Sequence, residues 1–318
     1  MKTKRILSLL LAVLMLGTLV SAFASCGGDD VYNIGIIQLA QHEALDKATE
    51  GFMDALTEKL GDKVHFDLQN AQGEQNNCTT IVTKFVNNRV DLIMANATNA
   101  VTAAHEATET IPIVGTSVTD YVGAGFAASN ERPGSNVTGA SDMNAVTNQM
   151  ALIRAFAPDA KKIGIIICSA EENSRIQANE AKTVFEGEGY AVNIYYANDS
   201  SDLQQVANKA VSENDVLYLP TDNLVAANMG IVRDVAIAAK TPVIAGEASM
   251  CNEGALASYS ISYYDLGYAA GLQAYEILVN GKDPAEMPIK IFTTDELKLI
   301  VNEEFMEELG LSLPDSLK

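Results

Sequence analysis

Short runs of apolar, mostly β-branched residues alternate along the chain with longer segments in which apolar residues recur every three or four positions. The runs at 32–38 and 162–168 (YNIGIIQ and KIGIIIC) are nearly continuous in their apolar character, and a polar loop and an amphipathic segment follow each. Strands that are apolar on both faces are typical of parallel sheets covered by helices on both sides. The pattern therefore predicts an α/β fold.

This pattern occurs twice. The strands expected at 32–38, 91–96 and 111–115 correspond to those expected at 162–168, 215–220 and 241–246, and helices are expected at 44–60, 79–87, 175–187 and 203–212. A chain of 318 residues is long enough for two domains. The sequence therefore predicts two Rossmann-like lobes, each built on a parallel sheet.

The C-terminal part contains more elements than one βαβαβ unit needs. Strands are expected at 254–261 and 289–292, and helices at 264–278 and 302–309. This surplus fits a chain that crosses between the lobes three times, near Ser141, Ile261 and Pro288. We therefore expect a first lobe of residues 31–141 and 262–288, a second lobe of residues 142–261 and 289–318, and a hinge of three crossovers.

The first 25 residues predict an export signal rather than a part of the fold. Three basic residues occur within the first five positions, an apolar run follows at 6–20, and small residues lead to Cys26. A basic start, a short apolar run and a small-residue exit are the parts of a secretory signal, and the run is shorter than the roughly 20 residues of a membrane-spanning helix. We expect residues 1–25 to be removed and residues 26–30 to form a short tether.

The composition excludes some classes of function. The chain has 21 Lys and Arg against 41 Asp and Glu, a net charge of −20, which excludes a nucleic-acid binder that works through a basic surface. Four cysteines and three histidines in so long a chain predict neither a disulfide framework nor a His-rich metal site, and we expect no cofactor. The chain has no Gly-x-Ser-x-Gly elbow, phosphate loop or His-Glu-x-x-His motif, so an α/β enzyme is the least favoured interpretation.

The candidate site follows from the predicted sheets. Ligands of open parallel sheets bind beyond the carboxyl ends of the strands, and polar loops follow six of the predicted strands. The same side chains are also plausible helix N-caps, and both interpretations stay open. The candidate ligand-binding residues are Gln38, His42, Thr98, Thr116, Ser117, Thr119, Asn173, Ser174, Thr221, Asp222, Asn223 and Glu247.

These residue types suit a zwitterion. Hydroxyls and free N–H groups at helix starts favour a carboxylate, and the candidates for that role are Thr98, Thr116 and Ser117. An ammonium needs a carboxylate partner in a partly desolvated cleft, for which Asp222 is the first candidate and Glu247 the second. The residues therefore predict a site for a free amino acid. His42 is either a contact to the ligand side chain or a surface or capping residue.

Several runs along the whole chain resemble one known family. It is the family of ABC transporter substrate-binding lipoproteins, of the type I periplasmic-binding fold, that take up tryptophan, tyrosine or phenylalanine. The runs are QLAQHEALD at 38–46, NAQGE at 70–74, PIV at 112–114, TD at 119–120, NVTG at 136–139, PTDN at 220–223 and YYDLG at 263–267. Two positions depart from the family pattern, because Asn99 and Tyr121 stand where members often carry proline.

The resemblance implies a clamp without catalytic activity. A monomer of this family would bind an amino acid, most readily an aromatic one, between its lobes and deliver it to an ABC permease in the membrane. Residues 23–26 (FASC) also resemble the bacterial lipobox, which implies that Cys26 is lipidated and anchors the exported protein to the outer face of the cytoplasmic membrane, at the cell surface; a plain secretory signal is the alternative. Other small polar solutes, such as a sugar, a purine or a peptide, and a surface sensor or adhesin with the same clamp remain alternatives.

Overall fold

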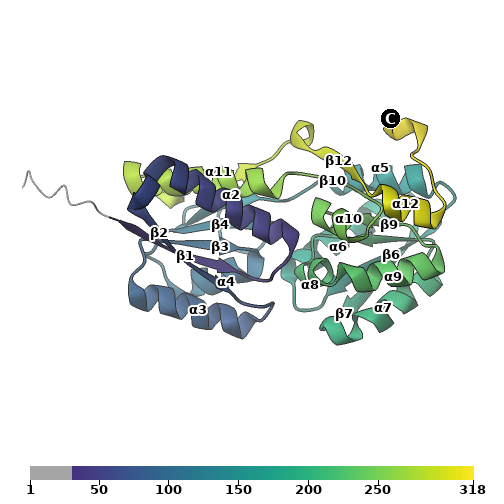
Figure 1. Cartoon of the computed structure of the whole chain (residues 1–318), viewed down its shortest axis with the longest axis horizontal. Helices are drawn as coiled ribbons and strands as arrows, with labels where there is room; N and C mark the ends of the chain where they lie inside the picture. The colour runs from purple at the N-terminus through teal and green to yellow at the C-terminus, as the bar shows by residue number, and fades with distance from the viewer. Residues whose placement is uncertain (1–30) are drawn as a thin grey trace, which may run out of the picture. The chain divides into compact units, whose positions relative to one another are not determined.

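Two six-stranded sheets organise the protein, and each forms the centre of one lobe (Figure 1). The computed structural model describes residues 31–318, and the export signal, Cys26 and most of the tether expected before Val31 lie outside the described residues. Residues Tyr32–Lys318 form one compact unit that contains both lobes. The two α/β lobes confirm the fold class that the apolar runs predict.

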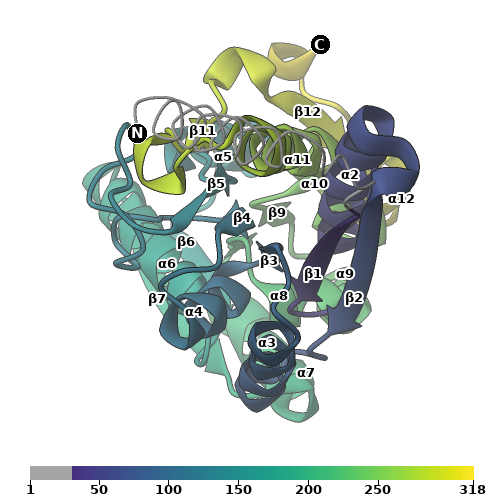
Figure 2. The ribbon, with the colours of Figure 1, turned by 90° about the vertical axis from the view of Figure 1, so that its left-hand side faces the viewer.

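The first lobe has a sheet of parallel strands in the order β11-β5-β4-β3-β1-β2. Helices α2 and α11 cover one face of this sheet, and α3 and α4 cover the other (Figure 2). The strands are β1 (Tyr32–Gln38), β2 (Val64–Asn70), β3 (Leu92–Asn96), β4 (Ile113–Val118), β5 (Val137–Ser141) and β11 (Lys290–Ile291), and the helices are α2 (Glu43–Leu60), α3 (Gln75–Asn88), α4 (Thr98–Ala107) and α11 (Tyr263–Asn280), with the short turns η1 (Gly61–Lys63) and η2 (Pro284–Glu286).

Burial on both faces explains why the central strands of this sheet are mostly apolar. In β1, Ile34 and Ile36 pack against α2 and α11, whereas Ile37 packs on the face of α3 and α4. Helices α2 and α11 lie very close together because each has a glycine at the contact. A Cβ at Gly51 would lie 2.1 Å from the carbonyl oxygen of Tyr264, and one at Gly267 would lie 1.9 Å from that of Ala48. Any larger residue would therefore push the two helices apart.

The second lobe has strands in the order β12-β10-β9-β8-β6-β7, of which only β12 is antiparallel to its neighbour. Helix α5 packs beside α6, and α7 beside α9. The strands are β6 (Lys162–Cys168), β7 (Ala191–Ala197), β8 (Val216–Leu219), β9 (Val243–Ala245), β10 (Ala257–Ser260) and β12 (Lys298–Val301), and the helices are α5 (Val146–Phe156), α6 (Glu172–Gly187), α7 (Ser200–Glu213), α8 (Asn223–Ala227), α9 (Met229–Ala239), α10 (Ala248–Glu253) and α12 (Glu303–Leu309), with the turns η3 (Thr294–Glu296) and η4 (Asp315–Leu317).

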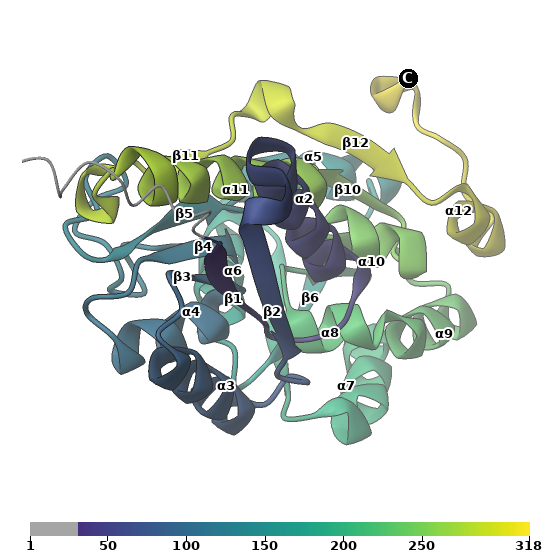
Figure 3. The ribbon, with the colours of Figure 1, turned by 60° about the vertical axis from the view of Figure 1, so that its left-hand side comes forward.

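The chain passes between the sheets three times. The first connection runs from β5 to α5, the second from β10 to α11, and the third from β11 to β12 (Figure 3). The strand expected at 289–292 was assigned to the second lobe, and this was wrong. Its residues Lys290 and Ile291 form β11, which pairs with β5 of the first sheet. The reason is that the preceding residues are still held there, since Ile289 is buried in the first core and Thr138 Oγ1 donates to the Met287 carbonyl oxygen.

None of the helices described at 31–318 is long and apolar enough to cross a membrane.

Candidate functional site

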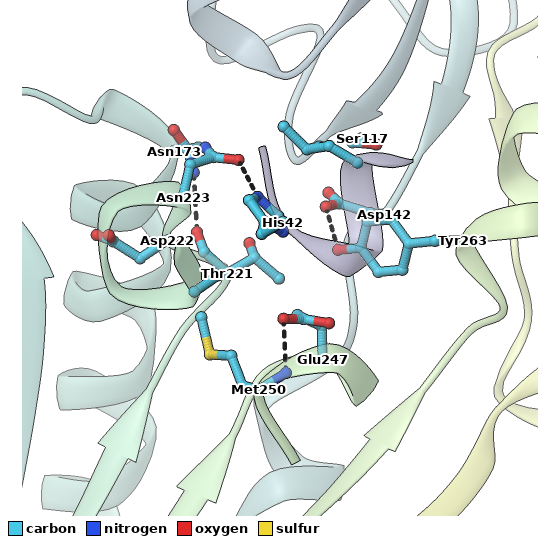
Figure 4. A pocket seen from close by; sticks show the side chains of 12 residues that line it. His42, Ser117, Asp142, Asn173, Thr221, Asp222, Asn223, Glu247, Met250 and Tyr263 are labelled. Carbon is cyan, nitrogen blue, oxygen red and sulfur yellow. Dashed lines mark hydrogen bonds between the residues drawn. The ribbon is translucent and has the colours of Figure 1, made fainter. Parts of the chain in front are cut away.

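A small pocket lies where the rims of the two lobes meet (Figure 4). We call it the interlobe pocket. It is lined from both lobes and from two of the connections by His42, Leu45, Ser117, Asp142, Asn173, Thr221, Asp222, Asn223, Ala226, Glu247, Met250 and Tyr263. The free space between these side chains is about 20 Å³, which holds about one water molecule. A solute larger than water can therefore occupy this pocket only after the side chains that line it have moved apart.

A larger cavity of about 720 Å³ adjoins this pocket, and Asn223 lines both. We call it the outer cavity. Its walls come from the starts of α3 and α4 in the first lobe and of α6, α7 and α8 in the second, including Gln75, Thr98, Glu172 and Ser200. The two cavities are thus neighbours that share Asn223 in their linings.

Four buried carboxyl groups surround the interlobe pocket, and no Lys or Arg among residues 31–318 lines it. They are Asp142, Glu171, Asp222 and Glu247, of which Glu171 lies behind Asn223. Burial of carboxylates is costly unless a cation or several hydrogen-bond donors compensate. The partners of each group therefore show which of them is left to bind a cation.

Backbone donors already occupy both oxygens of Asp222. Asp222 caps α8, where Oδ1 accepts from Val225 N at 2.9 Å, and Oδ2 accepts from Cys168 N at 2.6 Å. Burial raises the pKa of this carboxyl above its usual range, and the N–H donors oppose the shift. The structure thus gives Asp222, our first candidate for the ammonium partner, a capping role as well as a place in the pocket lining.

Glu171 and Glu247 are held in the same way. Glu171 accepts from Asn223 N at 3.0 Å and from Leu224 N at 2.9 Å, at the start of α8. Burial and the neighbouring Asp222 raise the pKa of Glu171 to about 8. Glu247 caps α10, accepting from Met250 N at 3.0 Å and from both the N and the Oγ of Ser249 at 2.6 Å.

Asp142 differs from the other three, because the other described residues that donate to its side chain do so through hydroxyl groups. Tyr263 Oη donates to Oδ2 at 2.8 Å, and Thr119 Oγ1 donates to Oδ1 at 3.3 Å. Burial raises the pKa of Asp142 to about 6, and the charge of Glu247 contributes to that rise. Asp142 accepts two of these hydrogen bonds, as many as Asp222 and fewer than Glu171 or Glu247, and its oxygens keep further capacity to accept.

The first lobe contributes hydroxyl groups that have no partner. Asn96 and Thr116 lie side by side at the ends of β3 and β4, and the buried hydroxyls of Thr98, Thr116 and Ser117 make no hydrogen bond with any described residue. The backbone here is strained, since φ is +89° at Ala97 and +55° at Ser117, where the register between β4 and β5 shifts. Such strain in non-glycine residues is typical of functional sites.

A hydrogen bond between the lobes involves His42. Its Nε2 lies 3.2 Å from Asn223 Oδ1, and its Nδ1 is buried without a partner among the described residues. Burial lowers the pKa of the imidazole, although the hydrogen bond to Asn223 and the charges of Asp46 and Asp222 act in the other direction. The ring is therefore neutral at pH 7.

The structure brings together seven of the twelve candidate residues in the interlobe pocket, and it places the others around it. Thr98 lines the outer cavity, Thr116 is fully buried at the end of β4, and Ser174 Oγ donates to the Thr221 carbonyl oxygen at 3.2 Å. Gln38 uses its side chain to bind Asp46 and Thr49, so its contacts stabilise the start of α2. The seven pocket residues are His42, Ser117, Asn173, Thr221, Asp222, Asn223 and Glu247.

Thr119 takes part in a second group of hydrogen bonds between the lobes. Gln177 Nε2, on α6, donates to Thr119 Oγ1 at 2.9 Å and also to Thr221 Oγ1. Tyr121, the tyrosine that departs from the family pattern, does not reach the pocket. It is buried in the first lobe, where its Oη donates to the Ala140 carbonyl oxygen at 3.2 Å.

Sequence reasoning missed several residues of the site. Asp142 belongs to the first connection between the lobes, Tyr263 begins α11 at the end of the second, and Glu171 precedes α6. A signal was available for Glu171, since it lies in the polar segment 169–174 that follows the strand predicted at 162–168. Asp142 had no such signal, because it follows a short strand that was not predicted.

A two-lobed α/β clamp with a polar pocket between its lobes is the architecture of a solute-binding protein, and comparisons with known proteins give its family. The chain belongs to the ABC transporter substrate-binding protein family, whose model matches residues 33–318. It is 40% identical over 328 residues to a tyrosine-binding protein of Clostridioides difficile, a match that covers 98% of this chain and 93% of that one.

Two solved structures are similar over nearly the whole chain. An ABC domain from Streptococcus pneumoniae in complex with L-Trp is 32% identical, with a TM-score of 0.86, and the match covers 91% of this chain and 97% of that one. The ligand-free, open structure of a substrate-binding protein with adhesive properties from Clostridium difficile is 40% identical, with a TM-score of 0.68 and coverages of 90% and 97%.

The two relatives rank in opposite orders by sequence identity and by TM-score. The open structure is closer in sequence but further in shape than the complex with L-Trp. Together with the hydrogen bonds that His42 and Thr119 make across the lobes, this indicates that the lobes are in a closed arrangement.

Proposed function

We propose that this protein is the extracytoplasmic solute-binding component of an ABC importer and that its ligand is a free amino acid, in the first place an aromatic one. The observation that carries the proposal is that negatively charged carboxyls and a hydroxyl free to donate line the same pocket. Asp142 and Glu247 provide negative charge without a cation in the lining, and Ser117 provides a buried hydroxyl without a partner.

The ammonium group binds at Asp142. This carboxyl receives only two hydroxyl donors, and it lies close enough to Glu247 for the charge of Glu247 to raise its pKa. An ammonium has three N–H donors, which would satisfy free acceptor sites on Asp142 and reduce its repulsion with Glu247. Tyr263 orients Asp142 through the 2.8 Å hydrogen bond.

The carboxylate group binds at Ser117, on the side of Thr98 and the start of α4. The unpartnered hydroxyls there are donors that a carboxylate would accept, and the N–H groups of the first turn of α4 favour an anion. The strained backbone of Ser117 holds its hydroxyl in the pocket lining. Preorganised donors of this kind reduce the entropy that binding costs.

The apolar part of the lining receives the ligand side chain. Leu45, Ala226 and Met250 provide this surface, and a thioether makes favourable contacts with aromatic rings. An aromatic ligand agrees with the relatives, one of which is described as a tyrosine-binding protein and another of which is a complex with L-Trp.

Ligand binding favours the closed form, which a permease then recognises. Cys26 is lipidated and keeps the clamp at the outer face of the membrane. A Cys26→Ser variant should be released into the medium, whereas the parent protein should remain with the membrane fraction; equal release of both would contradict lipidation.

Thermal melting of the purified protein against each of the twenty amino acids tests the proposed ligand class. A ligand at about 100 times its Kd should add about 2.7 kcal/mol to the free energy of unfolding. We expect the largest shift in the melting temperature with an aromatic amino acid. The absence of a shift with every amino acid would refute the proposal, and sugars, purines and peptides would then be tested.

A second candidate function is adhesion at the cell surface, which one relative favours because it is described as a substrate-binding protein with adhesive properties. Binding of the purified protein to host cells, with and without amino acid, tests this function separately.

A further inference from the structure

The orientation of the Asn223 side chain is determined by its neighbours. Glu171 Oε2 lies 2.6 Å from Asn223 Nδ2 and also accepts from the backbone N of Asn223 at 3.0 Å. Both oxygens of Glu171 already act as acceptors here, since Oε2 accepts from the backbone N of Asn223 and Oε1 accepts from Leu224 N, so the NH₂ group of the amide faces Glu171. The amide oxygen of Asn223 therefore faces the other way, toward His42.

This orientation determines which nitrogen of His42 carries the proton. The amide oxygen can only accept, and it lies 3.2 Å from His42 Nε2, so Nε2 must be the donor. A neutral imidazole has a single N–H group, and its other nitrogen is an acceptor. Burial of the ring disfavours its charged form in spite of the nearby carboxyls of Asp46 and Asp222. Nδ1 of His42 is therefore a hydrogen-bond acceptor.

No described residue donates to this acceptor. Nδ1 is buried and has no partner, and in Figure 4 the ring lies among the residues that line the interlobe pocket. The apolar lining cannot donate, and the lining hydroxyls of Ser117 and Thr221 make no hydrogen bond with Nδ1. Buried acceptors are satisfied in the great majority of cases, and an unsatisfied one costs free energy. Nδ1 is thus placed to receive a donor that arrives with the ligand.

We infer that His42 determines specificity, because its Nδ1 accepts a hydrogen bond from the side chain of the ligand. Tyrosine has a phenol O–H and tryptophan an indole N–H, whereas phenylalanine has no side-chain donor. His42 therefore selects tyrosine and tryptophan over phenylalanine. This inference rests on the proposed function, since it requires an aromatic amino acid in the interlobe pocket.

Titration calorimetry on the wild-type protein provides the first test. A site that is built to hydrogen-bond its ligand discriminates against an analogue without the donor. We expect L-tyrosine and L-tryptophan to bind about ten to a hundred times more tightly than L-phenylalanine and O-methyl-L-tyrosine. Equal affinity for phenylalanine would overturn the inference and leave the proposed function intact. If none of the four binds, the proposed function itself fails.

Two variants of His42 provide a matched second test. The amide of a glutamine lies about as far from the backbone as Nε2 of His42. His42→Gln therefore keeps the contact with Asn223 and loses the acceptor at Nδ1. In His42→Asn the amide lies near the position of Nδ1, so an acceptor is kept there. We expect His42→Gln to bind tyrosine and phenylalanine with about equal affinity. His42→Asn should keep part of the preference for tyrosine.

One result would assign Nδ1 to a different part of the ligand. If Nδ1 accepts from the ammonium group, His42→Gln should weaken the binding of tyrosine, tryptophan and phenylalanine by the same factor. That outcome would overturn the inference. Circular dichroism spectra of both variants serve as the folding control, and the ligand series on the wild-type protein remains decisive if either variant does not fold.

Discussion

The two lobes meet the cleft in different ways. In the first lobe, the rim carries polar groups without partners, and every unpartnered buried side-chain N or O atom in the part of the chain that the structure describes belongs to this lobe. In the second lobe, backbone and side-chain donors already hold the rim carboxyls of Glu171, Asp222 and Glu247. The first lobe is therefore organised to bind a ligand, whereas the second lobe is organised to be rigid while it closes.

Asp142 belongs to neither rim, since it lies in the first connection between the lobes. Its partners among the other described residues are hydroxyl donors. Removing one partner of a buried charge pair is strongly destabilising. Asp142→Asn should therefore weaken amino-acid binding about a hundredfold or more, measured by calorimetry. The matched control is Asp234→Asn on the exposed side of α9, which should leave Kd unchanged. An unaltered Kd in Asp142→Asn would show that the ammonium binds elsewhere.

A pair of serines, one from each rim, tests the difference between the lobes directly. Ser117 has no partner in its own lobe, whereas Ser249 Oγ donates to Glu247 at 2.6 Å. Ser117→Ala should weaken binding about tenfold without lowering the free energy of unfolding of the ligand-free protein. Ser249→Ala should lower that free energy by about 1 kcal/mol. If the two variants behave alike in denaturant unfolding and in binding, the contrast between the lobes is wrong.

The pH dependence of binding, compared between the wild-type protein and a variant without the Asp142 charge, tests Asp142 separately from the other buried carboxyls. Burial raises its pKa to about 6, and only the ionised form attracts an ammonium. Below pH 6 the carboxyl is increasingly protonated in the free protein, so binding must release a proton and affinity falls as pH falls. Kd at pH 5 should be about tenfold higher than at pH 7.5. The Asp142→Asn variant should lack this change, and a pH-independent Kd in the wild-type protein would contradict the assignment.

The smallest effect is expected at the edge of the cleft. Asn252 Nδ2, on α10, donates to Glu43 Oε2 on α2 at 2.9 Å, and both residues are exposed. Exposed polar contacts contribute little to stability. Asn252→Ala should change Kd by less than about threefold. A larger loss would mean that the exposed edge, rather than the buried pocket, controls closure.

Much of the fold could be predicted because burial on both faces leaves a clear pattern. The central strands β1, β3, β6 and β8 are mostly apolar and largely buried, and the sequence predicts all four. The edge strands β2 and β7 were missed because they are partly exposed and carry polar residues. The strand at 289–292 was assigned to the wrong lobe, since two residues of sheet pairing are too short for the local sequence to indicate a partner.

The candidate site could be predicted only as far as strand ends determine it. His42, Ser117 and Asn223 fall in the polar segments predicted after strands, and all three line the pocket, although Ser117 belongs to β4 and Asn223 begins α8. The role of Asp142 could not be predicted, because it depends on how three connections bring distant segments together. Nor could the local sequence reveal that the oxygens of Asp222 are occupied, since one of its donors, Cys168 N, belongs to another strand.

The central claim is that the pocket binds both charged ends of an amino acid. Titration calorimetry with tyrosine, tyramine and 3-(4-hydroxyphenyl)propionate tests it most directly, because tyramine lacks the carboxylate and the propionate lacks the ammonium. We predict that tyrosine binds about a hundredfold or more tightly than either of the other two compounds. Comparable affinity for all three would contradict the claim.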